Sequence, residues 1–211
     1  KANTNDGASQ AGKAGVAAIE GVTVPADSSV KTNANSDLKN TADAAKKAID
    51  ETAGLTDDQK QTAKDQIDKA VDAAKQAIGQ AKSNKAVTDA VNNGTVAINK
   101  DAANAAIDGA LNKKQSEING ATNLDQTTKD NLIKEATAAA TTAKDAIDKA
   151  TTNNDVATEQ TKGTNAIDAV KVPSLTDSQT AAKQAIDDAL NTKKSEINGA
   201  TNLDQTTKDN L

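Results

Sequence analysis

The sequence predicts an all-α protein in which antiparallel three-helix bundles follow one another in tandem and form an elongated rod. One junction between bundles is expected to be a continuous helix. Three observations lead to this prediction: a long segment occurs twice, aliphatic residues recur at helical spacing, and the connections between helical stretches are short and polar. The repeated segment is residues 106–132 and 185–211. The two copies differ only at Gly109/Asp188, Lys113/Thr192 and Gln115/Lys194.

Composition excludes a thick globular core. The 211 residues include no Phe, Trp, Tyr, Met, Cys, His or Arg, and most of the 36% that are hydrophobic are Ala. Aromatic residues and leucine clusters normally fill a core, so slender alanine-rich helix packing is expected instead. The absence of Cys excludes disulfides and thiol chemistry. Together with the absence of Met, it fits a chain that is exposed to oxidants.

The charge pattern argues against nucleic acid and membrane. The net charge of −5 comes from 25 Lys and 30 acidic residues that are interleaved, as on solvated helix faces. There is no basic stripe and no aromatic ring to stack on a base, so we expect no nucleic-acid partner. No apolar run approaches the roughly 20 residues of a membrane span, so none is expected in this sequence.

Two sets of equivalent residues give the repeat period. Ile49, Ile118 and Ile197 recur at one shorter and one longer interval, and the pattern GxxAI recurs at the same two intervals. GxxAI occurs at Gly15–Ile19, Gly94–Ile98 and Gly163–Ile167. A unit of about 70 residues is therefore repeated, and the longer interval adds roughly ten residues between the GxxAI pattern and the next helix.

The first helix of a unit is predicted at about 101–119, where Ile107, Leu111 and Ile118 share one face. Gly120 is predicted to end it, with Gly54 and Gly199 at the matching positions of the other units.

The second helix is predicted at about 126–150. Its apolar stripe is Leu132, Ala136, Ala139, Ala143, Ile147 and Ala150. In the first unit Thr56 and Gln59 have the spacing of a capping box, with Leu55 just before it. In the other units Asp125 and Asp204 are predicted N-caps.

The third helix is predicted to begin after short turns near 83–84 and 153–154. Its aliphatic residues are Val87, Val91 and Ile98 in one unit and Val156 and Ile167 in the next. Gly94 and Gly163 recur within it, which favours a close approach of two helices over a ligand contact.

The junctions are predicted to differ in stiffness. Nothing between Val96 and Ile107 breaks a helix. Ile98 and Ile107 are nine residues apart and so face opposite sides of a helix, as expected if one helix serves two bundles. The longer junctions contain Pro25 and Pro173, which interrupt a helical hydrogen-bond ladder, so these joints should be kinked or flexible.

The expected division of the chain follows from these junctions. Residues 1–22 are predicted to be the last helix of a preceding repeat, and 23–98 and 99–167 are predicted to be complete three-helix repeats. Residues 168–211 are predicted to be the first helix of a further repeat and the start of its second. We expect the chain to be a fragment of a longer protein.

Residues for catalysis or metal binding are not found. The acidic pairs Asp57–Asp58 and Asp187–Asp188 lack the spacing of a calcium loop, and the first pair is expected to stabilise a helix N-terminus. No His can activate a hydroxyl, and Ser195 beside Lys194 points to another side of its helix. We therefore expect no enzyme activity, no catalytic, cofactor-binding or metal-binding residues, and no cofactor.

The order of motifs resembles a helical repeat of giant Gram-positive surface proteins, of which the staphylococcal extracellular matrix-binding protein type is the best-known setting. The resemblance rests on AxxAI at Ala103–Ile107, Ile118, NLDQTTKDNL at Asn123–Leu132, AKDAIDKATTNNDV at Ala143–Val156 and GTNAI at Gly163–Ile167. It implies tandem repeats in a cell-wall-anchored protein outside the cell, with roles in adhesion or biofilm suggested for some members. It carries over no catalytic residues.

Two functions are compatible with these features. The first is a structural stalk, a monomeric rod that projects a distal domain from the cell wall. The alternative is a repeat that itself binds host matrix or plasma proteins, which would need an exposed apolar patch. The aliphatic candidates for such a patch are Val30, Val71, Val96 and Leu175.

Overall fold

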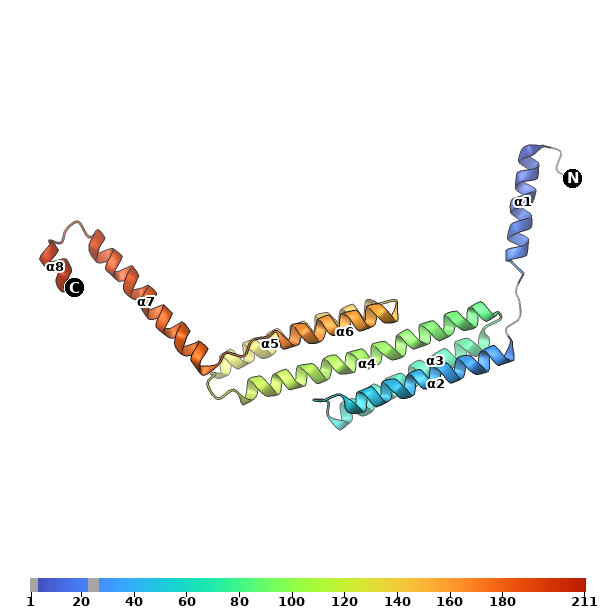
Figure 1. The fold of residues 1–211 in the computed structure, drawn as a ribbon, viewed down its shortest axis with the longest axis horizontal. Coiled ribbons are helices and arrows are strands. Elements are labelled where there is room, and N and C mark those ends of the chain that lie inside the picture. Colours follow the sequence, from blue (N-terminus) through green and yellow to red (C-terminus); the bar gives the residue numbers. More distant parts are fainter. Residues whose placement is uncertain (1–3, 23–26) are drawn as a thin grey trace.

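The computed structural model describes residues 4–22 and 27–211, and every regular element in these ranges is an α-helix, which confirms the predicted fold class (Figure 1). The described helices are α1 (Asn5–Glu20), α2 (Ser28–Glu51), α3 (Asp57–Gln80), α4 (Asn84–Gly120), α5 (Gln126–Lys149), α6 (Asn153–Asp168), α7 (Leu175–Gly199) and α8 (Gln205–Asn210). Pro25 lies outside the described residues, so the joint predicted there is not seen.

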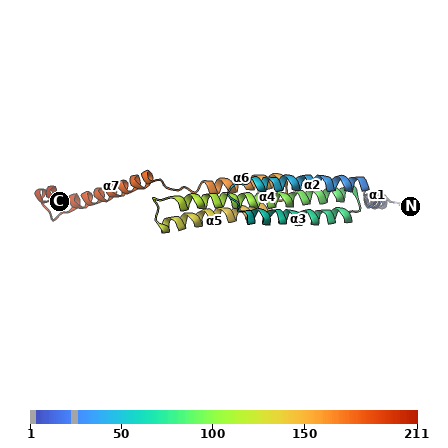
Figure 2. The same cartoon turned by 90° about the horizontal axis from the view of Figure 1, so that it is seen from below.

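Two three-helix bundles share α4. Helices α2 and α3 pack on each other and on α4, and α5 and α6 do the same. Figure 1 shows the two hairpins on opposite faces of α4, and Figure 2 shows α2 and α6 along one of its sides with α3 and α5 along the other. At 37 residues, α4 is about 55 Å long. The predicted continuous helix is thus confirmed.

The two faces of α4 supply the two cores. Ile98 and Ala105 belong to the first core, whereas Ala103 and Ile107 belong to the second. The apolar residues alternate between faces because one helix serves two bundles that overlap along its middle. The other large, fully buried side chains are Leu38, Ile49, Ile67, Ile78, Val87, Ile118, Ile147, Val156 and Ile167.

Side-chain hydrogen bonds cap the second helices of the repeats as their sequences predict. Thr56 and Gln59 form the capping box of α3, and Asp125 and Asp204 cap α5 and α8. A lysine at the start of each second helix also donates to a carbonyl at the end of the preceding helix, where a positive charge is favourable. These bonds are Lys60 Nζ to Asp50 O (2.9 Å), Lys129 Nζ to Asn119 O (2.9 Å) and Lys208 Nζ to Asn198 O (3.0 Å).

The glycines inside the third helices lie where helices touch. A Cβ atom on residue 94 would lie 2.5 Å from the Cβ of Ala74 and 3.0 Å from Cδ1 of Leu38. At Gly163 a Cβ would collide with Ala143 and lie 2.7 Å from Cδ1 of Ile107. The predicted close approach is confirmed in both bundles.

Two local predictions need correction. Gly120 and Gly199 are the last residues of α4 and α7, but Gly54 does not match them, because α2 already ends at Glu51. Gly54 has φ 92° and lies in the turn between α2 and α3. On α5, Ala140 is buried, whereas Ala139, which packs against the core, and Leu132 are only partly buried.

Helices α1 and α7 stand apart from the bundles. The chain leaves the helical conformation after Asp168, and Pro173 lies in a non-helical stretch before Leu175, so this joint is kinked as predicted (Figure 1). Neither helix has a buried residue. Most of their large aliphatic side chains are exposed, namely Val16, Ile19, Leu175, Ile186 and Leu190, whereas Ile197 is partly buried.

Candidate functional site

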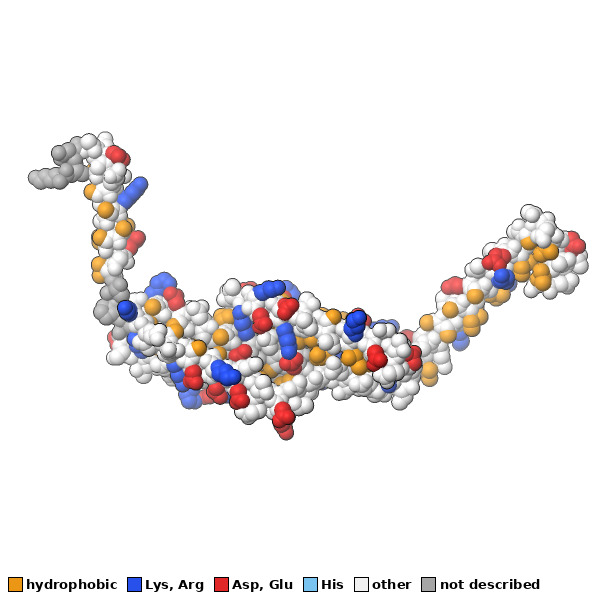
Figure 3. All heavy atoms as spheres, turned by 180° about the vertical axis from the view of Figure 1, so that it is seen from behind, with side chains coloured by type: hydrophobic (Ala, Val, Ile, Leu, Met, Phe, Trp, Pro, Cys, Tyr) orange, Lys and Arg blue, Asp and Glu red, His pale blue; other side chains and the backbone are white. Residues whose placement is uncertain are grey.

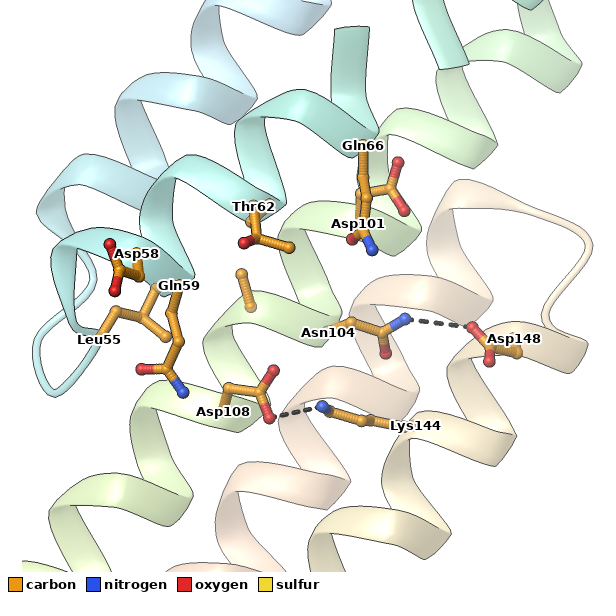
Figure 4. Close-up of a pocket in the computed structure, with 12 residues that line it drawn as sticks. Leu55, Asp58, Gln59, Thr62, Gln66, Asp101, Asn104, Asp108, Lys144 and Asp148 are labelled. Atoms are coloured by element: carbon orange, nitrogen blue, oxygen red, sulfur yellow. Dashed lines mark hydrogen bonds and ion pairs between the residues drawn. The ribbon is translucent and has the colours of Figure 1, made fainter. Parts of the chain in front are cut away.

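A groove crosses the molecule where the two bundles overlap. It has a volume of about 340 Å³, and the start of α3, the middle of α4 and the end of α5 form its walls. Figure 4 shows that its polar side chains come from all three helices. Four carboxylates line it, those of Asp58, Asp101, Asp108 and Asp148. Lys144 is the one cation among the residues that line this groove.

Helical spacing places these groups together. Asp101 and Asp108 are seven residues apart on α4 and therefore lie on one face, one above the other. Lys144 and Asp148 are four apart on α5 and likewise share a face. Asp58 lies in the first turn of α3, where the helix dipole favours a negative charge.

Three contacts tie α5 to α4 across the groove. Lys144 Nζ lies 2.5 Å from Asp108 Oδ1. Asn104 Nδ2 donates to Asp148 Oδ1 at 3.1 Å, and Lys100 Nζ donates to the backbone oxygen of Asp148 at 2.7 Å. The dashed lines of Figure 4 mark the two contacts between side chains. Lys144 pairs with Asp108, and Asp101 has no ion pair among the described residues. Partial burial, and then the negative charge of Asp148, raise the pKa of Asp101 to about 6.

The groups that line the groove are mainly carboxylates, amides and one lysine. In the described ranges no three His, Cys, Asp or Glu residues are grouped so that they could hold a metal ion. Ser195, the nucleophile considered from the sequence, lies on exposed α7 and donates to Asn191 O at 2.9 Å. Because the pKa of Asp101 is near 6, its carboxyl can bind and release a proton near neutral pH at the place where the two bundles meet.

Each complete bundle also carries a shallow apolar trough between its second and third helices. The troughs measure about 240 Å³ beside Gly94 and about 320 Å³ beside Gly163. Their lining residues occupy equivalent positions in the two repeats and are mostly alanines. The troughs exist because glycine and alanine leave space on the outer side of a close helix contact.

The repeat pattern agrees with a known family. The family profile described as Domain of Unknown Function (DUF1542) matches residues 30–102 and again residues 99–175. The chain belongs to the DUF1542 family. DUF1542 is a repeat domain of unknown function known from Gram-positive surface proteins. The two matches overlap at 99–102, which is the part of α4 where one bundle gives way to the next.

Other comparisons add no named relative to the DUF1542 repeats. No curated protein and no solved structure matches the chain. Across residues 4–22 and 27–211, none of the helices combines the length and the apolar character that a membrane crossing requires.

The residues singled out from the sequence lie apart from one another in these DUF1542 repeats. Asp57 and Asp58 are in the first turn of α3, as predicted, while Asp187 and Asp188 are exposed on α7. The four candidates do not form the apolar patch that the alternative function would need, because Val71 is buried and Val30 and Val96 pack against the cores. Of the four candidates only Leu175 is exposed.

Sequence reasoning missed the groove. Asp58, Asp101 and Asp148 lie on three different helices, and nothing in their spacing along the chain indicates contact. One signal was present: Asp101 lies in the short junction between repeats, where residues of two bundles must meet.

Proposed function

We propose that these DUF1542 repeats are part of the stalk of a Gram-positive cell-wall-anchored surface protein, of the staphylococcal extracellular matrix-binding protein type. In this role the rod holds a distal adhesive domain away from the wall and carries no catalytic activity. The observation that supports the proposal is the sharing of α4 by two bundles. A shared helix couples consecutive repeats and extends the molecule along one axis, which is what a spacer needs.

The surface supports the same function. Lysine and acidic side chains are interleaved over the bundle face shown in Figure 3, and the larger aliphatics of both bundles are buried or partly buried. Protein-binding hot spots are rich in Trp, Tyr and Arg, and the sequence contains none of them. Mixed charges keep such a rod soluble and discourage association with neighbouring copies, so we expect a monomer.

The test is to remove one repeat. A chain from which residues 99–167 are deleted keeps α2, α3 and the part of α4 that ends at Ile98, joined to the segment that follows Ile167 in the parent. Its maximum dimension can be compared with that of the parent by small-angle X-ray scattering. We expect a loss of about 36 Å or less, because a bundle helix of 24 residues has that length. An unchanged maximum dimension would contradict a spacer, since it would mean that the repeat adds no reach.

The rival function is binding of a host matrix or plasma protein by the repeats themselves. It can be tested by surface plasmon resonance with immobilised full chain and purified albumin, immunoglobulin and fibronectin. The stalk proposal expects no binding at micromolar concentrations. Sub-micromolar affinity for any of the three would favour the rival and overturn the proposal.

The location can be tested separately. Antibodies against the repeats should label intact cells of the source organism, and the antigen should fractionate with the wall. Antigen found only in the cytoplasmic fraction would refute the proposed location.

A further inference from the structure

The turn between α2 and α3 makes a contact beyond its own bundle. Residues 52–55 of this turn lie on α4 at Gly109, which is past the junction and belongs to the second repeat. A Cβ atom on residue 109 would lie 2.7 Å from Ala53 O and 2.7 Å from Cγ2 of Thr52. Separations of this kind are shorter than van der Waals contact, so the two backbones approach as closely as they do only because residue 109 has no side chain.

The α2–α3 turn also has a glycine, Gly54, at its contact with α4. Gly54 has φ 92°, a conformation that other residues adopt rarely, and a Cβ there would collide with Gly109 O and lie 2.8 Å from Cγ of Lys113. Asn112 completes the contact, because its Nδ2 donates to Gly54 O at 3.0 Å and to Gln59 Oε1 at 2.8 Å. The interface is therefore a glycine–glycine contact held by one asparagine.

The other repeats of this chain carry larger residues at both positions. The equivalents of Gly109 are Asn40 on α2 and Asp188 on α7, and both are exposed. The equivalent of Gly54 in the next turn is Asn123, whose φ is not positive. Ala105, which is buried in the first core, corresponds to Ser36 and Gln184, which are also exposed.

The joint that follows the second bundle is built differently. The turn equivalent to the α2–α3 turn is the one between α4 and α5, and it makes no such contact with α7. Instead, Asn123 Nδ2 donates to the backbone oxygen of Pro173 at 2.8 Å, within the non-helical stretch between α6 and α7. Thus the joint with the continuous helix has small residues at 54, 105 and 109, and the joint that contains proline has larger polar residues at the equivalent positions.

We propose that the glycine–glycine contact between the α2–α3 turn and α4 locks two consecutive repeats into one rigid body, and that Asn and Asp at the matching positions leave the next joint unlocked. A single helix of this length bends under thermal motion unless neighbouring elements hold it, and the turn holds α4 from the side at the point where the bundles overlap. An Asp at residue 109 would separate the backbones and would place a carboxylate against the carbonyl oxygen of Ala53. The inference concerns the joint alone and does not depend on the stalk function.

The experiment measures the distance between the two bundles in the full chain. The sequence has no Cys, so cysteines introduced at the exposed positions Asp72 on α3 and Glu135 on α5 are the only labelling sites. Spin labels at these sites report the distribution of distances between bundles by pulsed electron resonance. In the parent we expect one narrow peak.

Variants use the residues that the chain carries at its other joints. Gly109→Asp and Gly54→Asn should each change the narrow peak into a broad distribution, and Asn112→Ala should broaden it less because it removes hydrogen bonds without adding bulk. The matched control is Gly120→Asp, which adds the same side chain to the same helix where no atom lies within 4 Å. Circular dichroism checks that each variant keeps its helix content, so that broadening is not due to unfolding.

The outcomes separate the contact from the helix. If the distribution for Gly109→Asp stays as narrow as that of the parent, the continuous helix alone makes the joint rigid and the proposal is wrong. Equal broadening in Gly120→Asp would also overturn it, because the effect would then arise from any charge added to α4.

Discussion

A glycine-to-alanine substitution should have opposite effects at two positions of the first bundle. Gly94 on α4 faces α3, where an added Cβ would lie 2.5 Å from the Cβ of Ala74. Gly79 lies near the end of α3, and nothing is within 4 Å of a Cβ there. Both substitutions raise helix propensity, but only Gly94→Ala adds an atom where there is no room.

The sizes of the two effects can be estimated. Two carbon atoms are in contact at about 3.5–4.0 Å, so Gly94→Ala must push α3 and α4 apart by roughly 1 Å and loses part of their dispersion energy. Overpacking by a methyl group costs about 1–3 kcal/mol, and the gain in propensity returns about 1 kcal/mol. The net loss of about 1 kcal/mol should lower the melting temperature of a chain of this size by roughly 2–4 °C. Gly79→Ala should raise it by a few degrees, with a gain of about 0.5–1 kcal/mol.

Thermal unfolding followed by circular dichroism at the helical band is the suitable assay, because the chain has no aromatic residue to report unfolding by fluorescence. The reasoning would be refuted if Gly94→Ala raised the melting temperature as much as Gly79→Ala does. That result would mean that the helices can separate at no cost and that the glycine is not required for their close packing.

Three further predictions concern single side chains. Asp101→Asn should raise the melting temperature more at pH 7.5 than at pH 5. Partial burial, and then the charge of Asp148, raise the pKa of Asp101 to about 6 in the folded chain, so its carboxyl is mostly protonated at pH 5 and its destabilising charge develops as pH rises through that value. An equal effect at both pH values would contradict this. Thr56→Ala removes the hydroxyl that accepts from Gln59 N, which is one of the two hydrogen bonds of the capping box of α3. The free energy of unfolding measured in urea should therefore fall by about 1 kcal/mol, and an unchanged midpoint would argue against a role for the cap. Ile107→Ala removes a fully buried side chain from the second core and should lower the free energy of unfolding by about 2–5 kcal/mol in the same assay. Hydrogen exchange should accelerate first in α5 and α6. Faster exchange only in α2 and α3 would show that Ile107 belongs to the other core.

Most of the helix pattern could be predicted from sequence because it depends on neighbouring residues. The capping box at Thr56, the shared helix through Val96–Ile107 and the opposite faces of Ile98 and Ile107 all follow from contacts within a few helical turns. The prediction for Gly54 was wrong for a related reason. Local rules assign such a glycine to a helix end, whereas its positive φ and its lack of a side chain serve a contact with another repeat.

The groove could not be predicted from the sequence, although the sequence shows each of the residues that line it. Asp101 lies at the start of the helix predicted at about 101–119, and Asp148 lies near the end of the helix predicted at about 126–150. Their effect on each other depends on how α5 is seated on α4, and that depends on both cores together. The exposure of the candidates for an apolar patch could not be predicted for the same reason. Whether Val71 faces solvent or a neighbouring helix depends on the rotation of α3 within its bundle.

Local sequence was sufficient to specify an all-helical chain, a recurring unit and one junction that continues as a helix, because capping, periodicity and the positions of proline act over short stretches. Packing between helices set how far the two bundles overlap on α4, which carboxylates share a groove, and why glycine occupies residues 54 and 109. Those features arise between helices that are distant along the chain, where close packing in three dimensions, and not local conformational preference, selects the contact.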